Sequence, residues 1–243
     1  MYRETRETLH HVEDIDTARL LLEQGADPNE KDGNNHSPLH NVRNVEIARL
    51  LLDYGADPNA RNENNSTPLH FARNAEIAKV LLDQRVNPNT VNNEGDTPLH
   101  LVENEDIARL FLDQGVSPNA RNNRGDTPLH VVENENVARI LLDRGANPNV
   151  VNTNGSTPLH LVVNVNIARL LLEYGSDPNA IDEEDNTPLH YVHNANIARL
   201  LLAYGANPNL RNIHGHIPLD IIEDDDIHAL FRMWERRGMR QSG

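Results

Sequence analysis

The tetrapeptide Thr97-Pro98-Leu99-His100 decides the fold, because it returns in close variants every thirty residues. The final residues of the eight copies are His10, His40, His70, His100, His130, His160, His190 and Asp220. A fixed period of about 20 to 50 residues is typical of stacked repeats rather than of one globular core. We therefore expect a solenoid of eight repeats along the 243 residues.

The residues around this tetrapeptide predict the first half of each repeat. Residues 92–96 are rich in Asn, Asp and Gly, which favour a turn. Thr97 is suited to cap a helix whose first residue, Pro98, needs no backbone donor. We expect this helix to end near Glu103, with Asn104 as a left-handed stop.

A longer helix is predicted to follow from Asp106. Its apolar residues recur at three- and four-residue spacing, which indicates one broad buried stripe. Gly115 then ends the helix, and a proline three residues later prevents its resumption. Arg85 occupies the equivalent position in the third repeat, so we expect it to be strained if that position needs a positive φ.

These residues resemble the ankyrin-repeat family. Thr67-Pro68-Leu69-His70 and Gly55-Ala56-Asp57-Pro58-Asn59 carry the match, which recurs over residues 1 to about 235. The resemblance implies an all-α helix-turn-helix solenoid with protruding β-turn or hairpin fingers. The family repeat has about 33 residues, and this shorter one lacks three residues between its His and Ile. A proline precedes the closing Asn and removes a backbone donor, so we expect less strand-like fingers.

The boundaries of the repeats follow from the spacing. We predict a single array over residues 1–237, with repeats ending near residues 30, 60, 90, 120, 150, 180 and 210. Residues 211–237 form a C-terminal capping unit, and residues 238–243 form a frayed tail. We expect Trp234 to cover the last groove, because terminal repeats need a different outer face. The array is therefore expected to be complete.

Composition excludes several functions. With 22 Lys and Arg against 37 Asp and Glu, the net charge is −15, which disfavours nucleic-acid binding. Without cysteine there is no disulfide and no thiolate metal ligand. No signal peptide or membrane span is visible. We expect a soluble, monomeric, cytoplasmic protein. Its near-identical repeats also resemble ankyrin proteins of intracellular bacteria and large viruses, so the host cytosol is an alternative location for a secreted effector.

The recurring histidines are the main candidates for chemistry. One histidine in each layer cannot converge on one ion, because packed helices lie about 10 Å apart. We instead expect each imidazole to bond its own Thr and the neighbouring turn, as the family resemblance implies. His214 and His216 lack a third metal ligand, and residues 223–226 lack the spacing of a calcium loop. Catalysis needs unlike groups at one point, so we predict no enzyme activity, no metal and no cofactor.

A basic column is predicted along the second helices. Arg19, Arg49, Lys79 and their equivalents are followed four residues later by an acid in six of the seven repeats. Ion pairs at this spacing stabilise helices weakly. We therefore expect a largely neutralised outer ridge, with pairs such as that of Arg139 with Asp143.

Positions that vary between repeats are the candidates for binding. They lie at the finger tips, at the finger entrances and at the end of the first helix. In the ankyrin family these zones line a concave groove that binds partner proteins. The candidates for partner binding are Lys31, His36, Arg43, Arg61, Glu63, Arg73, Glu94, Asp96, Glu103, Arg121, Arg124, Asp126, Glu133, Val163, Glu183, Glu184 and His193.

Charge among these candidates changes along the chain. Early repeats offer Arg43 and Arg73, whereas later ones offer Glu103, Glu133 and the acidic finger at residues 182–185. This asymmetry predicts a partner protein docked in one direction, with its acidic part near the second and third repeats and its basic part near the seventh. Two alternatives remain. The protein is an effector or inhibitor that occludes an enzyme, or it is a self-assembling scaffold.

Overall fold

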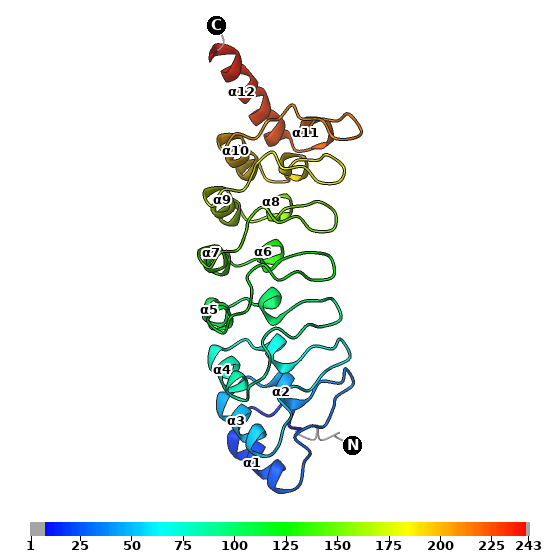
Figure 1. Cartoon of the computed structure of the whole chain (residues 1–243), viewed down its shortest axis with the longest axis vertical. Helices are drawn as coiled ribbons and strands as arrows, with labels where there is room; N and C mark the ends of the chain where they lie inside the picture. The colour runs from blue at the N-terminus through cyan, green and yellow to red at the C-terminus, as the bar shows by residue number, and fades with distance from the viewer. Residues whose placement is uncertain (1–7, 242–243) are drawn as a thin grey trace, which may run out of the picture. The chain divides into compact units, whose positions relative to one another are not determined.

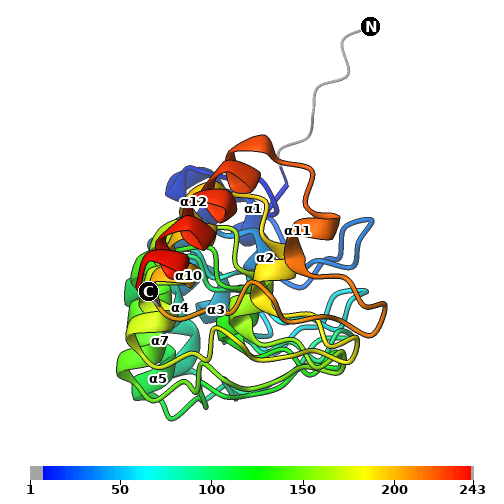
Figure 2. The ribbon, with the colours of Figure 1, turned by 90° about the horizontal axis from the view of Figure 1, so that it is seen from above.

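The computed structural model describes residues 8–241 (Figure 1). Contacts divide the chain into an N-terminal body, up to Asn123, and a C-terminal body, from Arg124. Each body stacks repeats in layers, and each complete repeat supplies one short helix followed by one longer helix. Within each body the long helices lie on one side and the loops between repeats, the fingers, protrude on the other (Figures 1 and 2).

The long helices of the first seven repeats all have nine residues. In the N-terminal body they are α1 (Ile15–Glu23), α3 (Val45–Asp53), α4 (Ala75–Asp83) and α5 (Glu105–Asp113). In the C-terminal body they are α7 (Glu135–Asp143), α9 (Val165–Glu173) and α10 (Ala195–Ala203). The last helix, α12 (Asp225–Gln241), is longer.

The short helices each span four residues and begin at the proline of the tetrapeptide. In the N-terminal body they are α2 (Pro38–Asn41), η1 (Pro68–Phe71) and η2 (Pro98–Leu101). In the C-terminal body they are α6 (Pro128–Val131), α8 (Pro158–Leu161), η3 (Pro188–Tyr191) and α11 (Pro218–Ile221). Some of them are 3₁₀ rather than α because one turn is too short to establish the α pattern.

The bend between the two helices differs from the prediction. The short helix ends at Leu101, not near Glu103. Asn104 has φ −110° and ψ 131°, so the predicted left-handed stop is wrong. Its side chain instead caps the next helix, accepting hydrogen bonds from the amides of Asp106 at 2.9 Å and Ile107 at 3.2 Å. An N-cap residue needs an extended backbone, so α5 begins at Glu105, one residue before the predicted start.

The predicted end of the long helices is confirmed. Gly115 has φ +80°, in the left-handed region where glycine is at ease. Arg85 adopts φ +58° at the equivalent position. The third repeat therefore carries the backbone strain that the sequence predicts.

The core of each body lies where successive long helices meet. Ala108 is fully buried, and Ile107 and Phe111 are each 1% exposed. In the C-terminal body, Ala168 and Leu171 are also fully buried. Because the same positions are filled in every layer, each repeat buries its apolar stripe against its neighbours.

The fingers are turns, as the repeated proline predicts. The described residues, 8–241, contain no β-strand. Within one finger, the amide of Asn92 donates to the Asp96 carbonyl at 3.1 Å. Between fingers, the amide of Asn93 donates to the Asn64 carbonyl at 2.9 Å. These bonds stack the fingers in register without forming a ladder.

The C-terminal helix extends beyond its predicted end. α12 continues to Gln241, so the tail predicted to fray from residue 238 is helical that far, and residues 242–243 lie outside the described chain. The side chain of Trp234 is 36% exposed. None of the helices in the described chain combines the length and the apolar character that crossing a bilayer requires.

Candidate functional site

The tetrapeptide histidines are structural, as predicted. Nδ1 of His70 accepts the Thr67 amide at 3.1 Å and lies 3.0 Å from the Thr67 hydroxyl. Nε2 therefore carries the hydrogen and donates to the Asp96 carbonyl of the next finger at 3.1 Å. One imidazole thus caps its own helix and holds the following layer. The same contacts recur at His40, His130, His160 and His190.

Burial favours the neutral form of four of these imidazoles. It lowers the pKa of His40 to about 4 against the opposing hydrogen bond to Ser66. Burial also lowers the pKa of His70, His160 and His190. A proton on Nδ1 would face the Thr amide donor, so protonation disrupts the cap. In the described residues no three His, Asp or Glu side chains are grouped so as to hold a metal ion.

Two of the predicted partner contacts belong to the stack itself. Asp96 and Asp126 are only 8% and 4% exposed. The Asp96 carboxylate accepts the Asn122 side-chain amide at 2.8 Å, and Asp126 accepts that of Asn152 at 2.8 Å. Both acids therefore join neighbouring fingers, and we leave them out of the proposed binding surface.

His36 stands where this finger contact is missing. It occupies the position of Asp96 two repeats earlier, and Asn62 occupies that of Asn122. The Asn62 side chain is 7% exposed, and its Nδ2 has no hydrogen-bond partner. The His36 ring instead stacks on His40, with centroids 5.3 Å apart and planes at 8°.

Lys31 and Arg61, at finger entrances, are exposed but engaged with the backbone. The Lys31 ammonium donates to the Arg61 carbonyl at 2.8 Å, and the Arg61 guanidinium donates to the Asn65 carbonyl at 2.8 Å. Arg124 is paired with Asp126 at 3.1 Å. These cations therefore also brace the fingers on which they lie.

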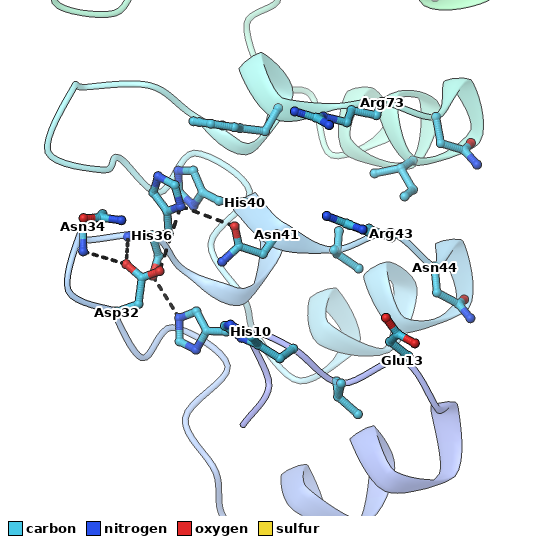
Figure 3. A pocket seen from close by; sticks show the side chains of 16 residues that line it. His10, Glu13, Asp32, Asn34, His36, His40, Asn41, Arg43, Asn44 and Arg73 are labelled. Atoms are coloured by element: carbon cyan, nitrogen blue, oxygen red, sulfur yellow. Dashed lines mark hydrogen bonds and ion pairs between the residues drawn. The ribbon is translucent and has the colours of Figure 1, made fainter. Parts of the chain in front are cut away.

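A groove in the N-terminal body brings together several predicted residues (Figure 3). Its volume is about 840 Å³, and its lining includes His36, Arg43, Phe71 and Arg73. The Phe71 ring lies 5.0 Å from that of His36. Both arginines are exposed, and in the described residues neither guanidinium has a carboxylate within 4.0 Å. The groove thus presents two free cations beside an aromatic surface.

A second groove lies within the C-terminal body, and most of the residues that line it are apolar. Its volume is about 660 Å³, and Leu161, Val162 and Val163 line it opposite Val131 and Glu133. Val163 is 83% exposed. Glu133 is the one carboxylate in this lining.

The other candidates are all exposed and do not line either groove. Glu103 and His193 lie after short helices, and Glu184 accepts the Asn186 side-chain amide at 3.3 Å. The remaining candidates, on the fingers, are Glu63, Glu94, Arg121 and Glu183.

Sequence reasoning missed the last residue of each short helix. Phe71 lines the first groove and Leu161 the second. Val131 and Tyr191 occupy the same position two repeats apart. The Tyr191 hydroxyl donates to the Asp182 carboxylate at 2.6 Å. Burial and this carboxylate raise the pKa of Tyr191 to about 12. The residue after each tetrapeptide varies between His, Asn, Phe, Leu, Val, Tyr and Ile, and this variation is the sequence signal that marks the position.

The predicted pairing on the outer ridge is wrong for α7. Arg139 pairs with Glu135, four residues earlier, at 3.0 Å. Asp143 instead accepts the hydroxyl of Tyr174. This tyrosine belongs to the next layer, so the sequence of a single repeat does not reveal the contact.

Comparison with known proteins agrees with the geometry. The family described as ankyrin repeats (3 copies) matches residues 9–92, 72–152 and 131–212. Among curated proteins no match is found. The three overlapping matches cover most of the chain, and the structure repeats the same two-helix layer through them. The chain therefore belongs to the ankyrin-repeat family.

Proposed function

We propose that this protein is a non-catalytic binding module whose N-terminal groove holds an acidic segment of a partner protein. Ankyrin repeats are generally protein–protein interaction modules, and this proposal names the chemistry of the segment. The observation that carries it is the pair of unpaired guanidiniums, Arg43 and Arg73, on neighbouring layers of one groove.

The groove favours carboxylates although it also contains acids. Asp32 is committed to its own finger, because its carboxylate accepts the amides of Asn34 at 2.8 Å and His36 at 2.9 Å. Glu13 lines one end of the groove, on the side of Arg43 away from Arg73 (Figure 3). A carboxylate of the partner between the two arginines can receive planar, charge-assisted hydrogen bonds from both.

Phe71 adds an apolar contact at the same place. It is half-buried beside Arg73, so an aliphatic or aromatic side chain next to the partner's acid can cover its free face. We therefore favour an acidic segment that also carries an apolar residue. Such a segment combines the electrostatic steering and the buried contact on which interfaces depend.

The test compares charge reversals on two faces. The double variant Arg43→Glu/Arg73→Glu is compared with Arg19→Glu/Arg49→Glu, which makes the same charge change on exposed residues of α1 and α3. Proteins captured from lysate by the wild type are quantified against both variants. We expect Arg43→Glu/Arg73→Glu, the groove variant, to bind the main captured protein about tenfold more weakly than the wild type, which corresponds to about 1.4 kcal/mol of binding free energy. Arg19→Glu/Arg49→Glu, the ridge variant, should bind it as the wild type does.

Two results would contradict the proposal. If both double variants captured the partner as well as the wild type does, the groove cations would not be used in binding. An equal loss in both would show a response to net charge alone. Light scattering on the wild type separately tests the self-assembling scaffold, because only that alternative predicts growth of the particle with concentration.

A further inference from the structure

The C-terminal body exposes an apolar residue that its fold does not require. Val163 is 83% exposed, the largest value among the exposed large hydrophobic residues of the described chain. The equivalent positions in the other repeats are Glu13, Arg43, Arg73, Glu103, Glu133, His193 and Glu223. Since polar residues occupy this position in all seven other repeats, stacking does not need valine, and its apolar surface is available for binding.

Val163 adjoins a stripe of apolar side chains within the same body. Leu161 is 45% exposed, Tyr191 41% and Ile221 43%. They end the short helices α8, η3 and α11, which contact one another in that order. The stripe therefore offers one half-exposed apolar side chain on each of three consecutive layers, with Val163 beside the first.

The spacing of this stripe suits an α-helix laid along it. Packed helices lie about 8–10 Å apart, and seven residues of an α-helix rise about 10 Å. A helix with apolar residues every seven positions therefore meets one layer with each repeat of its own pattern. Its intermediate apolar residues, three or four positions on, can fill the 660 Å³ groove between Val131 and Val163.

The charges around the stripe select the flanks of such a helix. Glu133 lines the groove, and Glu183 and Glu184 are exposed on a finger of the same body. The cation Arg124 is already paired with Asp126 at 3.1 Å. His193 and Glu223, which follow Tyr191 and Ile221 by two residues each, are also exposed. Carboxylates thus outnumber free cations, so basic flanks complement this surface.

We infer that the C-terminal body binds an amphipathic, basic α-helix of a partner protein on the stripe Leu161, Tyr191 and Ile221, with Val163 as its main apolar contact. This inference rests on the proposed function, that of a protein-binding module, but not on the acidic segment assigned to Arg43 and Arg73. The occupant has leucine-like residues at a seven-residue spacing and lysine or arginine on its flanks.

The probes are three fluorescent synthetic peptides of equal length, added to the full chain and followed by anisotropy. The first has leucines at helical spacing with lysine flanks. The second has the same composition in a scrambled order without an apolar face, and the third carries glutamate in place of lysine. We expect the first peptide to bind and the other two to bind at least about tenfold more weakly.

The variants copy residues that the chain already accepts at equivalent positions. Val163→Arg reproduces Arg43, and Leu161→Asn reproduces Asn41. The matched control is Val151→Arg, an exposed valine outside the groove where equivalent repeats carry Arg61 and Arg121. We expect Val163→Arg to lower the affinity for the first peptide by more than tenfold and Val163→Glu to lower it by less. The control Val151→Arg should leave this affinity unchanged.

The outcomes separate this inference from the proposed function. Absence of binding at about 1 mM peptide, or equal losses in Val163→Arg and Val151→Arg, overturns the inference. Self-association that Val163→Arg abolishes also overturns it, because a second copy of the chain is then the occupant. Peptide binding that depends on Val163 but survives Arg43→Glu/Arg73→Glu supports it even if the acidic-segment proposal fails.

Discussion

The third residue after the tetrapeptide histidine is arginine in two layers of the N-terminal body, Arg43 and Arg73, whereas in the C-terminal body one layer exposes Val163. Beneath these residues the interior is the same. His70 and His160 make the same bonds to a threonine and to the next finger. The comparison separates two kinds of position. Those that hold neighbouring layers together repeat, and those that face solvent are free to differ.

Acid tests the shared interior and has the largest expected effect. An unfolded histidine takes up its proton near pH 6.5, whereas folded His40 does so only near pH 4. Acid therefore favours the unfolded chain in this window, so the stabilisation is complete above about pH 6.5 and lost as the pH falls to about 4. We expect urea-induced unfolding, followed by circular dichroism, to show a loss on the order of 3 kcal/mol for His40 alone.

Single-site variants locate this loss in both bodies. His40→Gln and His160→Gln should each lower stability at pH 7.5 and reduce the further loss between pH 7.5 and 4.5. His193→Gln, at an exposed position, is the control and should leave the pH dependence unchanged. If only one of these two substitutions reduced the pH dependence of stability, the interiors of the two bodies would not be equivalent.

The helix-exit position gives a smaller effect that should be equal and opposite in the two bodies. Arg85→Gly relieves a residue with φ +58°, and Gly145→Arg imposes arginine on φ +85°. Beyond the two adjacent residues, no atom lies within 4 Å of a Cβ added at Gly145, so the change tests mainly backbone strain. We expect a gain and a loss of about 1 kcal/mol each in the free energy of unfolding.

Thermal and urea unfolding measure both changes. Lys79→Gly, inside α4, is the matched control, because glycine in a helix interior should cost about 1 kcal/mol rather than stabilise. A neutral result at residue 85 would mean that the long side chain of Arg85 offsets its strain.

The side-chain contact between neighbouring fingers gives the smallest expected change in stability. It is absent at His36 and Asn62, beside the first groove, and present at Asp96 and Asn122. His36→Asp places a carboxylate where Asn62 Nδ2 has no partner, as Asp96 does for Asn122. One added buried hydrogen bond contributes about 1 kcal/mol, reduced by the loss of the ring stacking on His40. The exchange Asp96→His should lower stability, because it removes the partner of Asn122.

Both exchanges are read by urea unfolding, and hydrogen exchange of the Asn62 side-chain amide reports the new bond directly. His214→Asp, on an exposed finger, controls for the added charge. If His36→Asp stabilises no more than His214→Asp, the unpaired Asn62 amide is not a liability in solution.

Much of the fold followed from one repeat read closely. The cap at Thr97, the helix end at Gly115 and the role of the histidines depend on local chemistry and on the next layer, and both are fixed by a strict period. The bend at Asn104 was misread because Asn is suited both to a left-handed stop and to an N-cap. The following residues decide between them, since their amides need an acceptor.

The candidate site was harder to predict than the fold. The sequence identifies which positions vary, but not which of them are buried. Asp96 and Asp126 lie at variable positions, yet both are buried in a contact between fingers. Tyr174 bonding Asp143 across layers was equally hidden. Such pairings depend on side chains brought together by stacking, at separations that one repeat cannot show.

The imidazole that joins each layer to the next also sets a rule for how this protein can change in length. Every bond it makes repeats with the thirty-residue period, so a whole repeat can be duplicated or lost while each remaining layer meets an equivalent neighbour. An insertion of a few residues between a histidine and the following finger offers no such substitution. Evolution of the binding surface by recombination is therefore easy in steps of thirty residues and costly in between.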